Sequence, residues 1–477
     1  MSPQTQNIIE QDQEEEGLRS LYLTDKSLGS QSIADYLIDR YQLKTIGEKS
    51  RDIYLYKNGI YVPGGNSIRS EIQRILRSLV SKHYKNEIIE KIKDSTTMDR
   101  KDFKVGRELI NLENEVLDIK TSKISAHDSK NLFFHKIPVS FVRDADCPVI
   151  KKFLLEVLDK QDVPLIQEWF GYILYRTYFI KKAIIFVGEG DTGKTTLLRL
   201  FERFIGKENV SGVSLQKVTS DKFAAAHFYN KHINIYDDLS FKDISDNGAF
   251  KIATGGGSIT GEYKFGDQFQ FENYAKLTFA CNKIPDVKDP NDAAYFGRWI
   301  IIHFRNEVAT PDKFLIDKIS TPEELSGLLN FALVGLKRLL ENQRFSYTKA
   351  PHEIKKEMQR SGSVIAQFVH DCLKEATGEW ISKTDMHEAF IRYARSKNLP
   401  ADTMENLGKK IRNYADYIID GKKSEMNPLT KNKVQVTGWR NVELGATDQL
   451  ELSEAELNSL FDEEHGQEKQ QALIPIS

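Results

Sequence analysis

The feature that most constrains this chain is an apolar run followed by a glycine-rich loop at residues 183–196. Residues 183–187 read AIIFV, which is typical of a buried strand. The next eight residues, GEGDTGKT, fit the pattern G-x-x-x-x-G-K-[ST], and residues 197–201 begin a helical pattern. A strand, a glycine loop and a helix in this order predict a phosphate-binding loop and hence a nucleotide ligand.

Each residue type in the loop has a chemical reason. Glycines let the backbone approach an anion without a Cβ in the way, and the N–H groups at the helix start face that anion. Lys194 is expected to reach the β/γ-phosphates of ATP and the Thr195 hydroxyl to bind Mg²⁺. The expected nucleotide contacts are Gly188, Glu189, Gly190, Asp191, Thr192, Gly193, Lys194, Thr195 and Thr196. The plain alternative is a glycine turn after a core strand.

Two later strands end in polar residues that suit the same site. The stretch 232–238, HINIYDD, predicts a strand followed by two acids, and 277–282, LTFACN, predicts a strand followed by an amide. Asp237 suits the second Mg²⁺ ligand and Asp238 suits the group that polarises the attacking water. Asn282 is a candidate to hydrogen-bond the γ-phosphate or that water. Ordinary polar turns at strand ends are the alternative.

Aromatic residues alternate along the stretch 254–271 and predict a hairpin that turns at residues 266–267. Lys264 and Phe265 lie near its tip, where a cation and a ring together suit single-stranded nucleic acid. An ordinary surface hairpin is the alternative. Further on, Arg298 precedes an apolar strand at 300–302 and is a candidate to complete a neighbouring subunit's ATP site. A surface salt bridge is the alternative for this arginine.

The order of GEGDTGKTT (188–196), IYDD (235–238), TGGG with its hairpin (254–271), FACNKIP (279–285) and GRW (297–299) resembles superfamily-three helicases. Over roughly 31–444 the chain is most similar to the helicase part of poxvirus and satellite-phage primase-helicases. The resemblance implies an AAA+-like core, a hexameric ring, ATP hydrolysed between subunits, and DNA gripped by the hairpin. No catalytic primase domain precedes residue 31, so a separate primase or polymerase is a candidate partner.

The predicted fold is α/β, with an AAA+-like core flanked by two smaller domains. We expect a disordered acidic tail (1–30), an α+β domain with a hairpin near 53–62 (31–150), the P-loop domain (151–348), a winged-helix domain (352–444) and an acidic tail (445–477). The third helix of the winged-helix domain, near 406–414, carries Lys409, Lys410 and Arg412 and is expected to enter the major groove of duplex DNA. A solvated charged face is the alternative.

Composition sets limits on partners and location. The formal net charge is −2, yet the two tails hold 14 acids and three bases, which leaves 64 bases against 55 acids over 31–444. A moderately basic body is compatible with DNA binding through local patches. No apolar run reaches the roughly 18 residues that span a bilayer. The three isolated cysteines argue against disulfides or zinc and suit the host cytoplasm.

These patterns together predict an ATP-driven replicative DNA helicase of a virus, plasmid or integrated element. One alternative is an ATP-switched initiator that marks or melts an origin without processive unwinding. The other is a winged-helix regulator that binds DNA without acting as a motor. A strand-displacement assay separates the first two, and mutation of Lys194 separates both from the third.

Overall fold

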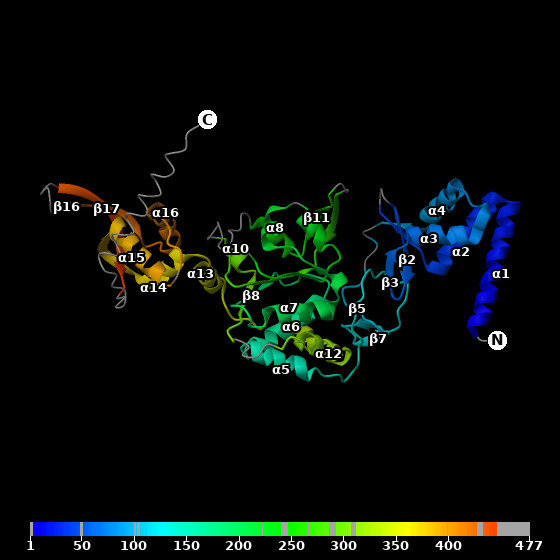
Figure 1. The fold of residues 1–477 in the computed structure, drawn as a ribbon, viewed down its shortest axis with the longest axis horizontal. Coiled ribbons are helices and arrows are strands. Elements are labelled where there is room, and N and C mark those ends of the chain that lie inside the picture. The colour runs from blue at the N-terminus through cyan, green and yellow to red at the C-terminus, as the bar shows by residue number, and fades with distance from the viewer. Residues whose placement is uncertain are drawn as a thin grey trace, which may run out of the picture.

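The computed structural model describes residues 3–47, 51–99, 102, 105–221, 223–239, 247–264, 268–285, 292–306, 312–397, 399–426 and 433–445. Within these ranges the chain folds into helices and five sheets. Figure 1 shows three regions in chain order, with the N-terminal region running from blue to cyan, the central region from turquoise through green to yellow-green, and the C-terminal region from yellow to orange-red. In this described part of the chain, no helix is both long and apolar enough to cross a membrane.

Residues 3–30 are almost entirely helical, so the prediction of disorder is wrong for this described part of the stretch 1–30. Helix α1 covers Pro3–Thr24 and α2 covers Lys26–Tyr41. The Asp25 carboxylate caps α2 by accepting from two backbone N–H groups. Buried Glu15 of α1 forms an ion pair with Arg74 at 2.5 Å. Composition could not indicate this helix, because a count of acidic residues does not distinguish a buried, paired carboxylate from one in solvent.

The rest of the N-terminal region holds two small sheets and two α-helices. Its elements are β1 (Lys44–Ile46), β2 (Asp52–Lys57), β3 (Ile60–Pro63), α3 (Gly65–Leu76), η1 (Arg77–Leu79), α4 (Lys82–Thr96), β4 (Thr97–Met98), β5 (Leu109–Asn111), β6 (Val116–Asp118) and β7 (Lys123–Ser125). The sheets run β3-β2-β1-β4 and β5-β6-β7. The predicted hairpin is confirmed, because Asn58 and Gly59 join β2 to β3 with φ of 51° and 85°, as this two-residue turn requires.

The central region is built around one parallel sheet, here named the core sheet. Its elements are α5 (Pro148–Val157), α6 (Val163–Leu174), β8 (Ala183–Val187), α7 (Lys194–Ile205), η2 (Lys207–Asn209), β9 (Val210–Ser211), α8 (Leu215–Ser220), η3 (Ala224–Phe228), β10 (Ile233–Tyr236), α9 (Gly248–Ala253), β11 (Ser258–Glu262), β12 (Gln268–Glu272), β13 (Lys276–Cys281), α10 (Ala293–Phe296), β14 (Trp299–His303), α11 (Leu315–Ile319) and α12 (Pro322–Asn342). The core sheet has the strand order β14-β8-β13-β10-β9, and every neighbouring pair is parallel. All five strands therefore begin at one edge, the amino edge, and end at the other, the carboxyl edge. The four predicted strands are present as β8, β10, β13 and β14, and β11 pairs with β12 as in the predicted hairpin, whose predicted turn at residues 266–267 lies outside the described residues.

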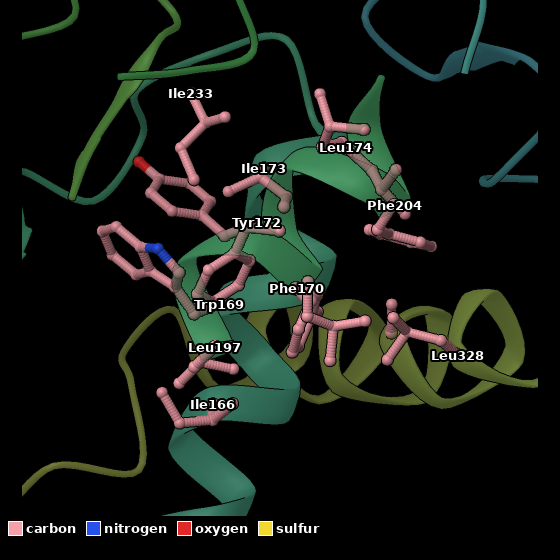
Figure 2. Packing of buried hydrophobic residues seen from close by; sticks show 14 of the residues in the cluster. Ile166, Trp169, Phe170, Tyr172, Ile173, Leu174, Leu197, Phe204, Ile233 and Leu328 are labelled. Carbon is pink, nitrogen blue, oxygen red and sulfur yellow. The ribbon is translucent and has the colours of Figure 1, made fainter. Parts of the chain in front are cut away.

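Apolar side chains cover both faces of the core sheet. Alternate residues of β8 belong to different clusters, with Ile184 and Phe186 in one and Ile185 in the other. The first cluster is formed with α6, α7 and α12, and Figure 2 shows Trp169 and Phe170 of α6 packed inside it. Because β8 is buried from both sides, its position at the start of the glycine-rich loop is rigidly determined.

The C-terminal region contains three helices and a sheet that follow a separate connecting helix. Its elements are α13 (Pro351–Gly362), α14 (Val364–Cys372), β15 (Leu373–Ser382), α15 (Lys383–Ser396), α16 (Met404–Tyr414), β16 (Ile419–Met426) and β17 (Lys433–Leu444). Helix α16 agrees with the helix predicted near 406–414, and the three strands form a sheet in the order β15-β17-β16. Half of the residues of β15 are exposed, so its sequence lacks the alternation that reveals a strand. From residue 446 onward the predicted acidic tail lies outside the described residues.

Candidate active site

The glycine-rich loop connects β8 to α7 and lies at the carboxyl edge of the core sheet. Gly193 has φ of 93°, and a Cβ there would come within 2.6 Å of the Val157 side chain. A Cβ on Gly188 would lie 2.4 Å from the Phe304 carbonyl oxygen, whereas one on Gly190 would meet nothing within 4 Å. Two of the three glycines are therefore required by the fold itself, and Gly190 is the one whose bare backbone faces open space.

Lys194 is the first residue of α7 and is 7% exposed. Its Nζ atom donates to the carbonyl oxygens of Gly188 at 2.7 Å and Glu189 at 2.5 Å. Burial lowers the pKa of Lys194, and the nearby Asp237 carboxylate opposes this shift. A phosphate oxygen is a stronger acceptor than a carbonyl oxygen, so the Lys194 ammonium can exchange these two partners for phosphate oxygens.

Thr195 and Asp237 meet across the carboxyl edge although they are 42 residues apart. The Thr195 hydroxyl donates to Asp237 Oδ2 at 2.7 Å, and the Asp238 N–H donates to Asp237 Oδ1 at 2.9 Å. A hydroxyl and a carboxylate are hard oxygen donors, which suit Mg²⁺ that keeps its remaining ligands from phosphate and water. No group of three or more His, Cys, Asp or Glu side chains that could hold a metal occurs among the described residues.

Strand β13 brings the other predicted residues into the same place because it lies between β8 and β10. The Gly188 N–H donates to the Cys281 carbonyl at 3.3 Å, directly before exposed Asn282. On the other side of β13, the Leu239 N–H donates to the Ala280 carbonyl at 2.9 Å, directly after Asp238. Asp238 itself is exposed and has φ of 57°. The structure therefore groups Lys194, Thr195, Asp237, Asp238 and Asn282 at the edge where parallel sheets bind ligands.

Arg298 lies at the opposite, amino edge, directly before β14. Its Nε donates to Thr254 Oγ1 at 2.9 Å, its Nη1 to the Ala294 carbonyl at 3.0 Å and its Nη2 to the Lys251 carbonyl at 3.3 Å. The five residues of β14 separate it from the carboxyl edge, which is a distance of about 16 Å at 3.3 Å per residue. Arg298 therefore does not belong to the lysine site of its own chain. The contact with Thr254 was not predicted, and the only sequence signal for it is that both residues stand in motifs, TGGG and GRW.

The hairpin formed by β11 and β12 also extends from the amino edge, because β12 leads into the start of β13. Tyr263 and Phe269 stack with ring centroids 5.5 Å apart. The Tyr263 hydroxyl donates to the Ala226 carbonyl at 3.2 Å and fixes the hairpin against η3. Lys264 is exposed near the tip, and Phe265 lies outside the described residues.

The basic residues of α16 are already paired with carboxylates of their own chain. Lys409 contacts Glu405 at 2.5 Å, Lys410 lies 4.0 Å from Asp402, and Arg412 lies 2.8 Å from Asp420. All three pairs are exposed, so each is weak and salt-sensitive. Duplex DNA would compete with these carboxylates for the basic side chains, so the predicted DNA contact and its alternative, a solvated charged face, both stay predictions.

Comparison with known proteins gives distant matches in two parts of the chain. Residues 186–298 match a family of unknown function (DUF5906), and residues 16–159 match the family described as D5 N terminal like. The first match runs from β8 to Arg298, and the second begins inside α1, as expected if that helix is part of a folded domain. Neither match spans half of the chain.

Two relatives are viral proteins. The chain is 24% identical over 293 residues to "Putative helicase 022R" of Frog virus 3 (isolate Goorha), a match that covers 56% of this chain and 29% of that protein. It is 23% identical over 294 residues to "Putative helicase 121R" of Invertebrate iridescent virus 3, which covers 54% of this chain and 29% of the relative. The solved structure titled "The A form apo structure of NrS-1 C terminal region-CTR" aligns with 86% of this chain and 98% of that chain at 12% identity and a TM-score of 0.44. The chain is thus similar, over about half its length, to less than a third of two proteins named as viral helicases.

Proposed function

We propose that this chain is an ATP-driven DNA helicase of a virus, plasmid or integrated element that works as a ring. The observation that carries the proposal is the hydrogen bond between Thr195 and Asp237 beside buried Lys194. This arrangement supports nucleotide hydrolysis at a P-loop, and the names of the two viral relatives favour a helicase among P-loop proteins. The parallel order of the core sheet supports the AAA+-like core that the sequence motifs implied.

In the proposed reaction the loop residues bind ATP and hold its phosphates. Lys194 exchanges its two carbonyl partners for β/γ-phosphate oxygens, and the backbone N–H groups at the start of α7 add their partial positive charge. Thr195 and Asp237 would hold Mg²⁺, which neutralises phosphate charge when bound. Asp238 accepts a proton from the attacking water, and Asn282 orients that water or the γ-phosphate.

The proposed ring explains why Arg298 lies far from its own nucleotide site. An arginine from the amino edge of one subunit would face the carboxyl edge of the next, where it stabilises charge on the transferring phosphoryl group. Single-stranded DNA is proposed to contact Lys264 and Phe265 of the hairpin, and duplex DNA the winged-helix domain. The ion pairs on α16 lead us to expect only weak, strongly salt-dependent duplex binding there. A separate primase or polymerase remains a candidate partner.

The proposal is tested by Lys194→Ala, with Lys207→Ala as the matched control at the other end of α7. Loss of the phosphate-binding cation should abolish ATPase activity and strand displacement, whereas removal of exposed Lys207 should leave both unchanged. ATPase near the wild-type rate in Lys194→Ala would overturn the site assignment. Robust wild-type ATPase without displacement of a forked strand would favour the origin-marking initiator instead.

The ring is tested by mixing two inactive variants, Arg298→Ala and Lys194→Ala. At each mixed interface of the right polarity an intact lysine site meets an intact arginine, so part of the ATPase activity should return. A trans arginine contributes on the order of 10³–10⁵ in rate, so recovery is measurable above either variant alone. If sedimentation shows mixed assemblies and no activity returns, Arg298 serves only its own subunit. Arg298→Lys should rescue little, because lysine lacks the planar fork.

A further inference from the structure

The guanidinium of Arg298 is held by neutral acceptors only. Its three hydrogen-bond partners are one hydroxyl and two carbonyl oxygens, from Thr254, Lys251 and Ala294. Among the described residues, no carboxylate lies within ion-pair distance of it. A phosphate oxyanion is a stronger acceptor than any of these groups, so the arginine can leave its present partners when an anion is offered.

Thr254 stands where the hairpin begins. It is fully buried, its own hydroxyl donates to the Phe250 carbonyl at 2.8 Å, and the same oxygen accepts from Arg298. At the other end of the hairpin, Asn273 donates to the Ala253 carbonyl at 2.6 Å. Both ends of the hairpin are therefore fastened to the last turn of α9, and Arg298 is fastened to the same turn.

The packing of α9 extends this connection into the core sheet. The Phe250 ring stacks on the Trp299 ring with centroids 4.6 Å apart and planes 13° apart. Trp299 follows Arg298 directly and begins β14. Lys251 of the same helix forms an ion pair with Asp292 at 2.7 Å. Movement of Arg298 thus acts on a helix whose end carries the hairpin.

We propose that Thr254 is a positioning residue that holds Arg298 on its own subunit and thereby links the arginine to the DNA hairpin. When Arg298 turns to the phosphates of the neighbouring subunit, Thr254 loses this partner and the hairpin's attachment to the core weakens. The nucleotide state of one subunit is in this way communicated to the hairpin of the next. This inference rests on the proposed function, because it requires ATP at the subunit interface and DNA at the hairpin.

The test compares Thr254→Val with Thr254→Ser in the full-length chain. Valine keeps the shape and removes the hydrogen bond, whereas serine keeps the hydroxyl. Loss of one hydrogen bond to a charged group changes an equilibrium by about tenfold, so we expect stimulation of ATPase by single-stranded DNA to fall about tenfold in Thr254→Val. Basal ATPase should persist, and Thr254→Ser should keep most of the stimulation.

A matched control is Thr219→Val, since Thr219 is also buried and donates to a helix carbonyl, that of Gln216 at 3.0 Å. This variant should retain stimulation by DNA. Undiminished stimulation in Thr254→Val would overturn the inference, as would loss of stimulation that Thr254→Ser does not restore. Absence of any ATPase in the wild-type chain would instead refute the proposed function.

If Thr254→Val does not fold, a second measurement tests the same link between Arg298 and the hairpin. In the wild-type protein a non-hydrolysable ATP analogue should change the affinity for single-stranded DNA. Arg298→Ala lacks the contact with Thr254 in every nucleotide state, so its affinity should match that of the wild type with the analogue and should not respond to the analogue. An ATP-dependent change of equal size in Arg298→Ala would overturn the inference.

Discussion

Replacement of Gly188 by alanine tests how the phosphate-binding loop is built, and Gly190 in the same loop is the matched control. A Cβ on Gly188 would lie 2.4 Å from the Phe304 carbonyl oxygen, whereas one on Gly190 would meet nothing within 4 Å. The Phe304 backbone cannot easily yield, because its N–H donates to the Val187 carbonyl at 2.8 Å. A normal contact therefore needs a displacement of about 1 Å, and overpacking of this kind costs about 1–3 kcal/mol.

The two variants should separate stability from nucleotide binding. Thermal unfolding of the full chain, without nucleotide and then with an ATP analogue and Mg²⁺, measures both. Gly188→Ala should lower the midpoint without nucleotide and also reduce the shift on binding, since the carbonyl that holds Lys194 moves. Gly190→Ala should change the free energy of unfolding by less than about 0.5 kcal/mol but lose most of the ligand-induced shift, which depends on the ratio of ligand concentration to Kd. An unchanged midpoint in Gly188→Ala, or a full shift in Gly190→Ala, would refute this reasoning.

Three further predictions follow from other parts of the chain. Asp238→Asn should fold normally, because Asn tolerates the φ of 57° at this position. The variant should bind ATP but not hydrolyse it, and an ATPase rate equal to the wild type would contradict the proposed role of Asp238. The double variant Lys264→Ala with Phe265→Ala should keep ATPase without DNA while unwinding falls, because stacking is worth about 1–3 kcal/mol per base; unchanged unwinding would make the hairpin a surface feature only. Burial lowers the pKa of His232 from 6.5 to about 3, so below pH 6.5 only the unfolded chain takes up this proton, and the free energy of unfolding falls by up to about 1.4 kcal/mol per pH unit. His232→Gln should therefore flatten the fall of the unfolding midpoint between pH 6.5 and 5, whereas the control variant at an exposed histidine, His352→Gln, should not. Equal slopes in the two variants would contradict this prediction.

That the candidate site residues lie close together could be predicted from the sequence, because the pattern that places each of them is local; their roles stay predictions. Asp237 and Asn282 directly follow strands with a strong apolar pattern, and Lys194 and Thr195 follow the glycine-rich loop after another such strand. Parallel strands bring their ends together whatever their separation in the chain. The same logic explains why Thr195 and Asp237 meet. It gives no way to foresee the strand order, in which β13 separates β8 from β10.

The features of the structure that could not be predicted are contacts between polar side chains that lie far apart in the sequence. Glu15 looked like one acid in a disordered tail, yet it pairs with Arg74, 59 residues away. Arg298 looked like an exposed cation, yet its guanidinium is held by Thr254 and two carbonyl groups. Charge and periodicity describe single positions, and neither reports a contact between distant ones.

Strand β13 has a mechanical consequence for any motion of the hairpin. It begins with fully buried Lys276, whose Nζ donates to the Tyr175 carbonyl at 2.8 Å, and it ends one residue before Asn282. Both of its sides are hydrogen-bonded, so it cannot slide by less than a residue, and a slip of one residue would turn every side chain to the wrong face. The strand is therefore a rigid link between the two edges of the core sheet. The segment 273–275 that joins it to β12 is itself held, because Asn273 donates to the Ala253 carbonyl at 2.6 Å and its Oδ1 accepts from the Ala275 N–H at 3.0 Å.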